Sequence, residues 1–257
     1  MNSNRINIVV LGAGNLAWHL SEEFQKKGQN ILQIYNRTEK KAEALSKILQ
    51  CDFTSKLENI NRNADLYILC ISDKSIAEIA NSLPIENNLV VHTSGAVHQD
   101  LIPQDRRGVF YPLQTFSKGK EIDFKGIPFC VEANHENDKK TLIKLAKTLS
   151  ISVHEISSEQ RKTLHLAAVF ANNFSNYMYS ISEEILSVDN ISFDILKPLI
   201  LETANKIIYH SPKESQTGPA IRDDQTSIDT HLNDLNNGNY YDIYKMLTEK
   251  LRAENKK

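Results

Sequence analysis

Gly12-Ala13-Gly14-Asn15-Leu16-Ala17 directly follows the apolar run Ile6-Asn7-Ile8-Val9-Val10-Leu11 and opens a stretch with helical periodicity. Gly12 permits a tight turn, Gly14 lets the backbone approach a pyrophosphate, and Ala17 lets the helix pack closely on the strand. The free N–H groups at the start of such a helix favour phosphate. The stretch predicts the phosphate-binding turn of a dinucleotide-binding domain. The alternative is a glycine turn in an α/β domain that binds nothing.

Short apolar runs alternate with helical patterns through the first half of the chain. Strands are expected over 6–11, 31–35, 66–71, 89–91, 109–111, 127–131 and 151–154, and helices between the early ones over 15–27, 39–49 and 74–83. Apolar strands separated by helices predict a parallel sheet covered on both faces, with right-handed crossovers. This is the doubly wound Rossmann form.

From about residue 157 onward the patterns are helical, and we expect no strand there. Helices are expected over 159–186, 192–210, 226–236 and 240–253, the second of them bent at Pro198, because proline cannot donate the helical hydrogen bond. We therefore predict the α/β class, with an N-terminal doubly wound Rossmann sheet followed by an all-helical C-terminal domain. The predicted domains are residues 1–155 and 156–257.

The composition excludes several classes of function. Of the 257 residues, 40% are hydrophobic and 24% charged, and the net charge of −2 gives no overall attraction to nucleic acid or anionic lipid. No apolar run approaches the roughly 20 residues that cross a bilayer. Cys51, Cys70 and Cys130 lack metal-ligand spacing, so we expect reduced thiols and no metal site. The first residues lack a signal-peptide pattern, and we expect a cytoplasmic protein.

The end of the second expected strand bears on the choice of cofactor. Tyr35-Asn36-Arg37-Thr38 lies about 24 residues past Gly12, where an NAD site usually places an acid for the ribose 2′-hydroxyl. Neutral Asn36, cationic Arg37 and the Thr38 hydroxyl suit a 2′-phosphate instead, so NADP is favoured over NAD. The alternative is that Arg37 is an exposed loop charge and Thr38 only caps the next helix.

The ends of two later strands are expected beside the nicotinamide end of the cofactor. Ser72 follows one strand and Ser94-Gly95 follows another, and the carboxyl ends of such strands face the ligand crevice. Ser94-Gly95 could equally form only a turn. The cofactor-binding residues predicted in this way are Gly12, Gly14, Asn15, Leu16, Asn36, Arg37, Thr38, Ser72, Ser94 and Gly95.

A polar stripe is expected on the long helix over 159–186. Arg161, His165, Asn172 and Asn176 are separated by four, seven and four residues, which puts them on one side of a helix. The apolar run Leu166–Ala171 predicts a buried helix, so these polar groups need partners. His165 is of the residue type that exchanges a proton near neutral pH. The alternative is a structural hydrogen-bond network or a solvated seam.

Two loops supply further candidates. In Thr217–Asp224, Arg222 offers a fork for a carboxylate or phosphate, but Asp224 could equally cap the next helix while Arg222 forms a surface ion pair. Phe110–Ser117 leaves a strand and is either a substrate contact or a packed crossover loop. The catalytic candidates are His165, Asn172 and Arg222, and the substrate-binding candidates are Gln114, Asn173, Asn176, Thr217, Gly218 and Asp224.

These segments resemble, in their order along the chain, a family of bacterial proteins that join a Rossmann-like domain to a domain of unknown function. The segments are Gly12–Ala17, Asn36–Thr38, His92–Ala96, Tyr111–Ser117, His165–Phe174 and Thr217–Asp224. The family carries the provisional label NADP oxidoreductase of the deazaflavin-dependent type. Its architecture is similar to that of pyrroline-5-carboxylate reductases, prephenate dehydrogenases and 3-hydroxyacid dehydrogenases.

The resemblance implies the fold and the cofactor but no substrate. Hydroxyacid dehydrogenases carry a catalytic lysine on the long interdomain helix, whereas this helix has Lys162 only at its start. This chain therefore departs from the lysine-based pattern of that family, and its helix offers His165 instead.

The sequence thus predicts an NADP(H)-dependent oxidoreductase that acts on a small molecule by hydride transfer in the interdomain cleft. His165 would exchange the proton, while Arg222 and Asn172 would hold the substrate. The alternatives are a non-catalytic, redox-sensing nucleotide-binding module and an interaction protein that binds no nucleotide. We also expect a homodimer through the helical domain, whose apolar surface exceeds what about 100 residues can bury. We expect no nucleic-acid or membrane partner.

Overall fold

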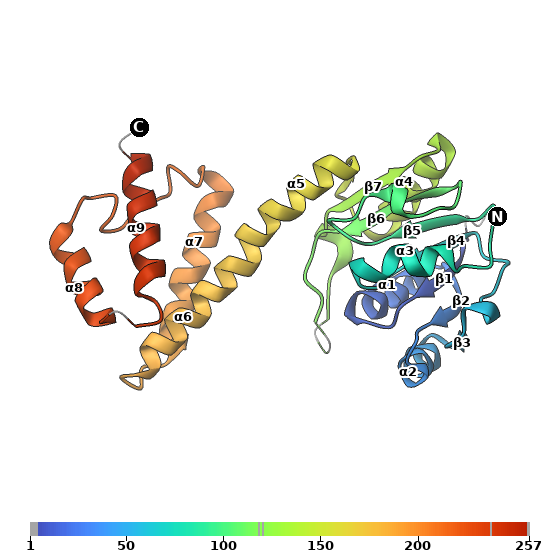
Figure 1. Cartoon of the computed structure of the whole chain (residues 1–257), viewed down its shortest axis with the longest axis horizontal. Helices are drawn as coiled ribbons and strands as arrows, with labels where there is room; N and C mark the ends of the chain where they lie inside the picture. Colours follow the sequence, from blue (N-terminus) through green and yellow to red (C-terminus); the bar gives the residue numbers. More distant parts are fainter. Residues whose placement is uncertain (1–4, 118, 120, 237, 256–257) are drawn as a thin grey trace. The chain divides into compact units, whose positions relative to one another are not determined.

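The structure is a computed structural model that describes residues 5–117, 119, 121–236 and 238–255. The chain divides into two compact units, residues 1–169 and 170–257, and each is described by itself (Figure 1). The boundary predicted between residues 155 and 156 falls just before α5 (Ser158–Ala168), a helix that belongs to the first unit. All three cysteines are free.

The first unit contains an eight-stranded sheet in the order β3-β2-β1-β4-β5-β6-β7-β8. The strands are β1 (Asn7–Leu11), β2 (Asn30–Tyr35), β3 (Asp52–Thr54), β4 (Leu66–Leu69), β5 (Leu89–His92), β6 (Arg107–Pro112), β7 (Phe129–Ala133) and β8 (Val153–Glu155). Leu11 of β1 lies beside Tyr35 of β2 and Leu69 of β4, so these three parallel strands end together at one edge. The strand order reverses at β1, which is the switch point of a doubly wound sheet. The predicted fold class is confirmed.

Two strands differ from the expectation for physical reasons. The edge strand β3 is only three residues long and starts with Asp52, a poor strand former, so no apolar run announces it. β7 runs antiparallel to β6, with Phe110 opposite Val131. Among the described residues between them, the one helix is the short 3-10 helix η3 (Phe124–Gly126), whereas a parallel return usually crosses the sheet in an α-helix.

Helices cover both faces of this sheet (Figure 1). They are α1 (Asn15–Lys26), α2 (Glu39–Leu49), α3 (Asp73–Asn81) and α4 (Glu136–Leu149), with the short 3-10 helices η1 (Leu57–Asn59) and η2 (Gln99–Leu101). α1, α2 and α4 pack on one face and α3 on the other. In α1 the buried residues Ala17, Leu20 and Phe24 recur at helical spacing, which is why this segment forms an amphipathic helix. Phe24 then packs on Phe110, with ring centroids 5.9 Å apart.

The helical run that follows β8 has three parts: α5, the π-helix η4 (Val169–Phe174) and α6 (Ser175–Ser187). α5 begins with a capping box in which Ser157 and Gln160 satisfy each other's backbone N–H groups. The expectation that this run is buried is wrong for the single chain, because Leu166 is 60% exposed and Phe170 is 63% exposed. Its apolar residues have too little of the chain's own surface to pack against.

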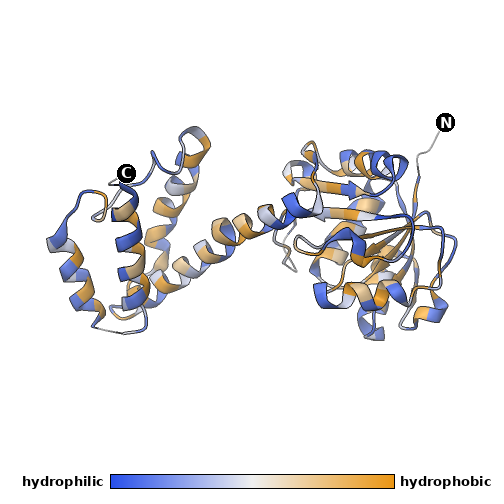
Figure 2. Cartoon of the chain, turned by 45° about the horizontal axis from the view of Figure 1, so that its top comes forward, coloured by the Kyte–Doolittle hydropathy of each residue, from blue (hydrophilic) through white to orange (hydrophobic). Residues whose placement is uncertain are grey.

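The second unit is helical, as expected, and contains η5 (Phe193–Leu196), α7 (Lys197–Tyr209), α8 (Gln225–Leu235) and α9 (Tyr241–Asn255) in addition to α6. Pro198 does not bend a helix, which corrects the expectation; it lies in the first turn of α7, where no intrahelical partner needs its missing N–H. Figure 2 shows hydrophobic residues along these helices. Within the described residues, no helix is long and apolar enough to cross a membrane.

Candidate functional site

The glycine turn after β1 is shaped by close backbone contacts. Gly12 has φ +121°, and a Cβ on it would stand 2.1 Å from the Cys70 carbonyl oxygen, so only glycine fits there. Its N–H donates to the Tyr35 carbonyl at 2.7 Å. By contrast, no atom lies within 4 Å of where a Cβ of Gly14 would stand. Gly14 is the N-cap of α1 and no side chain caps this helix, an arrangement that leaves its first N–H groups without a side-chain acceptor and suits a phosphate.

A cavity of about 250 Å³ opens beside this turn, between the ends of β1, β2 and β4. Its lining residues are Gly12, Ala13, Gly14, Tyr35, Asn36, Arg37, Lys41, Cys70, Ile71, Ser72, Ser75 and Ile79. Five of the predicted cofactor-binding residues therefore line one cavity: Gly12, Gly14, Asn36, Arg37 and Ser72. Lys41, which the sequence places with Lys40 near the Asn36-Arg37-Thr38 turn, also lines the cavity. Ser75 was missed as a site residue, although it lies one helical turn past Ser72.

Two cations stand at the β2 end of this cavity. Arg37 and Lys41 are both exposed, and neither has a carboxylate partner among the described residues. Thr38 occupies the N-cap position of α2, but its side chain makes no capping bond. The Asn36 amide donates to the Thr38 carbonyl at 3.0 Å, which holds this turn. Unpaired cations beside an uncapped helix start suit a phosphate group.

Other predicted residues near the turn hold the protein's own backbone. The Asn15 amide donates to the Phe116 carbonyl at 2.9 Å, and Leu16 packs against the core of the sheet. The exposed Gln114 side chain accepts from the N–H of Thr115, within its own loop. The structure thus fastens the segment after β6 against the start of α1.

The β5 loop, residues 93–97, is held by its own side chains. The N–H of Ser94 donates to Nδ1 of the buried His92 at 3.1 Å. The Ser94 hydroxyl oxygen accepts from the N–H groups of Ala96 and Val97, each at 3.1 Å. Burial, and secondarily the positive charge of Arg161, lowers the pKa of His92 to about 3, so this imidazole is neutral. Ser94 therefore orders the loop that carries Gly95.

His165 of α5 lies directly over this loop. Its Nδ1 is 3.3 Å from the hydroxyl oxygen of Tyr111, the penultimate residue of β6. A Cβ on Gly95 would stand 2.6 Å from His165 Nδ1 and 2.9 Å from Tyr111 Cζ, so only a glycine lets both rings approach. Burial raises the pKa of Tyr111, which keeps its hydroxyl protonated. The protonated Tyr111 hydroxyl can therefore donate to Nδ1 of His165 and orient this ring.

Tyr111 was missed as a site residue in the sequence. The available signal was its position at the end of a strand that enters the same sheet edge as Ser72 and Ser94. Since His165 is distant in sequence, nothing local linked the two.

The remaining predicted residues lie in the second unit. Asn172 and Asn173 in η4 and Asn176 in α6 are exposed, with no side-chain hydrogen bond among the described residues. Asp224 caps α8, since its carboxylate accepts from the N–H of Ser227 at 3.1 Å and from its hydroxyl at 2.7 Å. These two bonds lower the pKa of Asp224. Arg222 and Thr217 are exposed, while Gly218 has φ +114°. A substrate role for this group stays a prediction.

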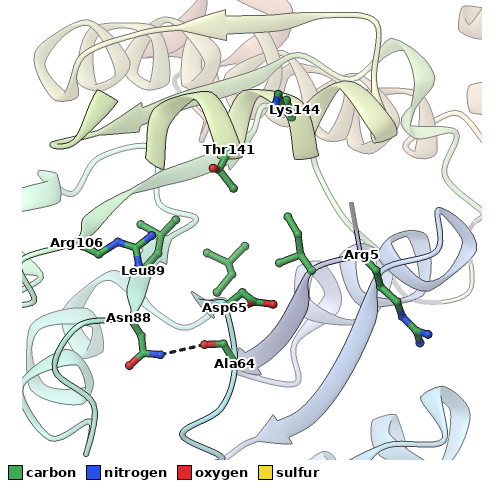
Figure 3. A pocket seen from close by; sticks show the side chains of 10 residues that line it. Arg5, Ala64, Asp65, Asn88, Leu89, Arg106, Thr141 and Lys144 are labelled. Atoms are coloured by element: carbon green, nitrogen blue, oxygen red, sulfur yellow. Dashed lines mark hydrogen bonds between the residues drawn. The ribbon is translucent and has the colours of Figure 1, made fainter. Parts of the chain in front are cut away.

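A larger cavity, of about 450 Å³, lies at the opposite edge of the sheet (Figure 3). Its lining residues are Arg5, Ile6, Ala64, Asp65, Leu66, Asn88, Leu89, Arg106, Thr141 and Lys144. Arg106 is already paired with Asp138, through its Nε at 3.0 Å, so its charge is not free for a ligand. Parallel sheets bind dinucleotides at the carboxyl ends of strands, which favours the smaller cavity as the cofactor site. The described residues contain no cluster of three or more potential metal ligands.

Comparisons with known proteins identify the family of this chain. A model described as "NADP oxidoreductase coenzyme F420-dependent" matches residues 7–94, and one described as "Domain of unknown function (DUF2520)" matches 127–251. BF3122 of Bacteroides fragilis, provisionally named an NADP oxidoreductase, is 42% identical over 97% of this chain and 98% of its own, with a TM-score of 0.89. The chain belongs to the family of BF3122. By that family and by its fold it is grouped with the NADP oxidoreductases.

More distant structures share the fold. TM1727 from Thermotoga maritima is 21% identical, with 97% of this chain and 98% of its own covered and a TM-score of 0.74. The 1-pyrroline-5-carboxylate reductase of Streptococcus pyogenes is 14% identical, with 99% of each chain covered and a TM-score of 0.65. Among proteins with curated functions, none matches this chain.

Proposed function

We propose that the protein is an NADP(H)-dependent oxidoreductase that transfers a hydride to or from a small molecule. The observation that carries the proposal is the cavity at the carboxyl ends of β1, β2 and β4, where an uncapped helix start and two unpaired cations meet. The start of α1 suits the pyrophosphate, and Arg37 with Lys41 suits the ribose 2′-phosphate. The absence of an acidic residue at Asn36 removes the usual partner of an unmodified 2′-hydroxyl.

The nicotinamide end would lie toward the β5 loop, because that loop follows the next strand along the same sheet edge. When bound, the cofactor supplies the hydride. The protein's own part is the proton. In the reduction of a carbonyl or imine, His165 would give a proton to the substrate oxygen or nitrogen, and in the reverse direction it would accept one. Tyr111, whose hydroxyl oxygen lies 3.3 Å from Nδ1 of His165, would orient this ring.

The cofactor assignment is tested by calorimetric titration with NADPH and NADH at one salt concentration. We expect the wild type to bind NADPH at least about tenfold more tightly, or about 1.4 kcal/mol. Arg37→Ala and Lys41→Ala should each remove most of that preference and leave NADH binding unchanged. Lys40→Ala is the matched control, since Lys40 is an exposed neighbour that does not line the cavity.

Two results would contradict this reading at different levels. Equal binding of NADH and NADPH would remove the 2′-phosphate assignment but leave the dinucleotide site. Binding of neither would overturn the enzyme proposal.

The role of His165 is tested once a substrate is found. His165→Ala should then lower turnover and leave NADPH affinity unchanged. Unchanged turnover would show that another group exchanges the proton, and no turnover of any substrate by the wild type would favour a redox-sensing module.

We also propose that the protein is a homodimer through its second unit. Among the described residues of that unit, the buried apolar side chains are Ile181, Ala220 and Ile228. Far more are exposed, including Ile185, Val188, Ile191, Ile195, Leu199, Leu201, Ile207, Ile208 and Tyr209. A unit with so small a core must bury its exposed apolar side chains against another surface in order to stay folded. A second copy of this chain supplies such a surface, because it carries the same apolar side chains.

A further inference from the structure

Among the described residues, Arg161 is the largest side chain that is fully buried. Its guanidinium reaches four groups in the first unit. Nε donates to the Ser94 carbonyl at 3.1 Å, and Nη2 donates to the Val97 carbonyl and to the Ser158 hydroxyl oxygen at 3.1 Å. Nη1 donates to Glu132 Oε2 at 2.7 Å. Both ends of the β5 loop are therefore bonded to one side chain of α5.

Glu132 of β7 completes the network. Its carboxylate accepts from the N–H of Ser158 at 3.0 Å and from the Ser158 hydroxyl at 2.7 Å. It also accepts from the Gln99 side-chain amide at 3.0 Å. The ion pair thus joins the β5 loop, β7 and the first turn of α5, and every bond lies within the first unit.

Stability alone is a weak reason for such a pair. Removing two charges from water is unfavourable, and well-packed apolar side chains often replace a buried ion pair with no loss of stability. What apolar side chains cannot reproduce is the fork that holds the Ser94 and Val97 carbonyls at fixed positions. The geometry therefore suggests a role in fixing the loop.

We infer that Arg161 is a positioning residue for the nicotinamide end of the site. It fastens the β5 loop to α5 one helical turn before His165, and so keeps His165 against Gly95 and Tyr111. The inference rests on the proposed function, because it takes the β5 loop to be the nicotinamide side. It goes beyond that proposal by assigning Arg161 to one half of the cofactor. Arg161 supports binding of the nicotinamide half and has no effect on binding of the adenosine half.

The experiment compares a double variant, Arg161→Met with Glu132→Leu, with the wild type. Removing both charges avoids the buried unpaired carboxylate that Arg161→Met alone would leave. The control is Arg107→Met with Asp100→Leu, a partly exposed ion pair at 2.9 Å that does not bond the β5 loop. Each protein is titrated with NADPH and with 2′,5′-ADP, which contains only the adenosine half of the cofactor. The fluorescence of bound NADPH reports the surroundings of the nicotinamide.

We expect the double variant to bind 2′,5′-ADP within about twofold of wild type and NADPH about tenfold more weakly, with altered fluorescence of bound NADPH. If the role of Arg161 were purely structural, the affinities for NADPH and for 2′,5′-ADP would fall by the same factor or would both stay unchanged. Wild-type NADPH affinity and fluorescence in the double variant would overturn the inference. If that variant does not fold, Arg161→Lys makes the same comparison, since lysine keeps the charge but not the fork. Failure of the wild type to bind either ligand would instead overturn the proposed function.

Discussion

Gly95 is a position in the candidate site where a larger side chain has no space, because the rings of His165 and Tyr111 lie against it. We predict that Gly95→Ala displaces His165 or Tyr111, because the new Cβ would stand 2.6 Å from His165 Nδ1. Overpacking of this kind lowers the free energy of unfolding by about 1–3 kcal/mol. Chemical denaturation and NADPH titration measure the two effects. Gly126→Ala is the control, since nothing lies within 4 Å of its added Cβ, and equal behaviour of the two variants would contradict the proposed packing.

His92 predicts how stability depends on pH. Its pKa is lowered from 6.5 to about 3 in the folded chain, so between those values the unfolded chain binds a proton that the folded chain does not. Stability must therefore fall as the pH decreases below 6.5, by about 1.4 kcal/mol per pH unit from this group.

The variant His92→Asn should remove that part of the slope, because its amide oxygen can still accept from the N–H of Ser94. Denaturation at pH values from 4 to 7 is the measurement. His210→Asn, which changes an exposed histidine, should keep the wild-type slope. An unchanged slope in His92→Asn would mean that other groups govern the acid response.

At the scale of elements, α5 matters because it carries both Arg161 and His165. Its start depends on the capping box of Ser157 and Gln160, and the hydroxyl oxygen of Ser157 accepts from the N–H of Gln160 at 3.3 Å. We predict that Ser157→Ala lowers the free energy of unfolding by about 1 kcal/mol. Thermal unfolding measures this loss. Ser180→Ala, in the middle of α6, should be neutral or slightly stabilising, and a similar loss there would argue against the capping role.

The elements also show where sequence patterns succeed. Strands β1, β4 and β5 are buried on both faces along nearly their whole length, so they appear as apolar runs that any reading of periodicity finds. The direction of β7 has no such local signal, because it depends on the path by which the chain returns from β6. The start of α5 does have a local signal, the Ser157-x-x-Gln160 capping pattern. This pattern locates the first residue of the helix more closely than its apolar residues do.

At the scale of the whole molecule, the exposed apolar side chains of the second unit predict the oligomeric state. We expect sedimentation at micromolar concentration to give twice the 29.2 kDa of one chain. Ile208→Glu, on α7, should produce monomer or unfolded protein, because it would bury a charge in the interface. Ile151→Glu changes a residue of the first unit that is 79% exposed and should stay dimeric. A wild-type species of 29.2 kDa would overturn the proposal.

The sequence by itself determined which residues shape the glycine turn and line the cavity beside it. Gly12, Gly14, Asn36 and Arg37 could be found because a strand, a turn and a helix start are close together in the chain, and their chemistry depends on local backbone geometry. The fold class followed from the same local periods.

Only the tertiary structure decided what surrounds His165. Tyr111 is 54 residues away from it in sequence, and Glu132 is 29 residues away from Arg161. Helical spacing predicted that Arg161 belongs to the same polar stripe as Asn172 and Asn176. In the structure Arg161 is buried where the strands of the sheet end, whereas Asn172 and Asn176 are exposed in the second unit. Helical spacing predicts which side of a helix a residue occupies. Which other segment meets that side depends on the strand order and on where the chain turns, and no local pattern encodes either.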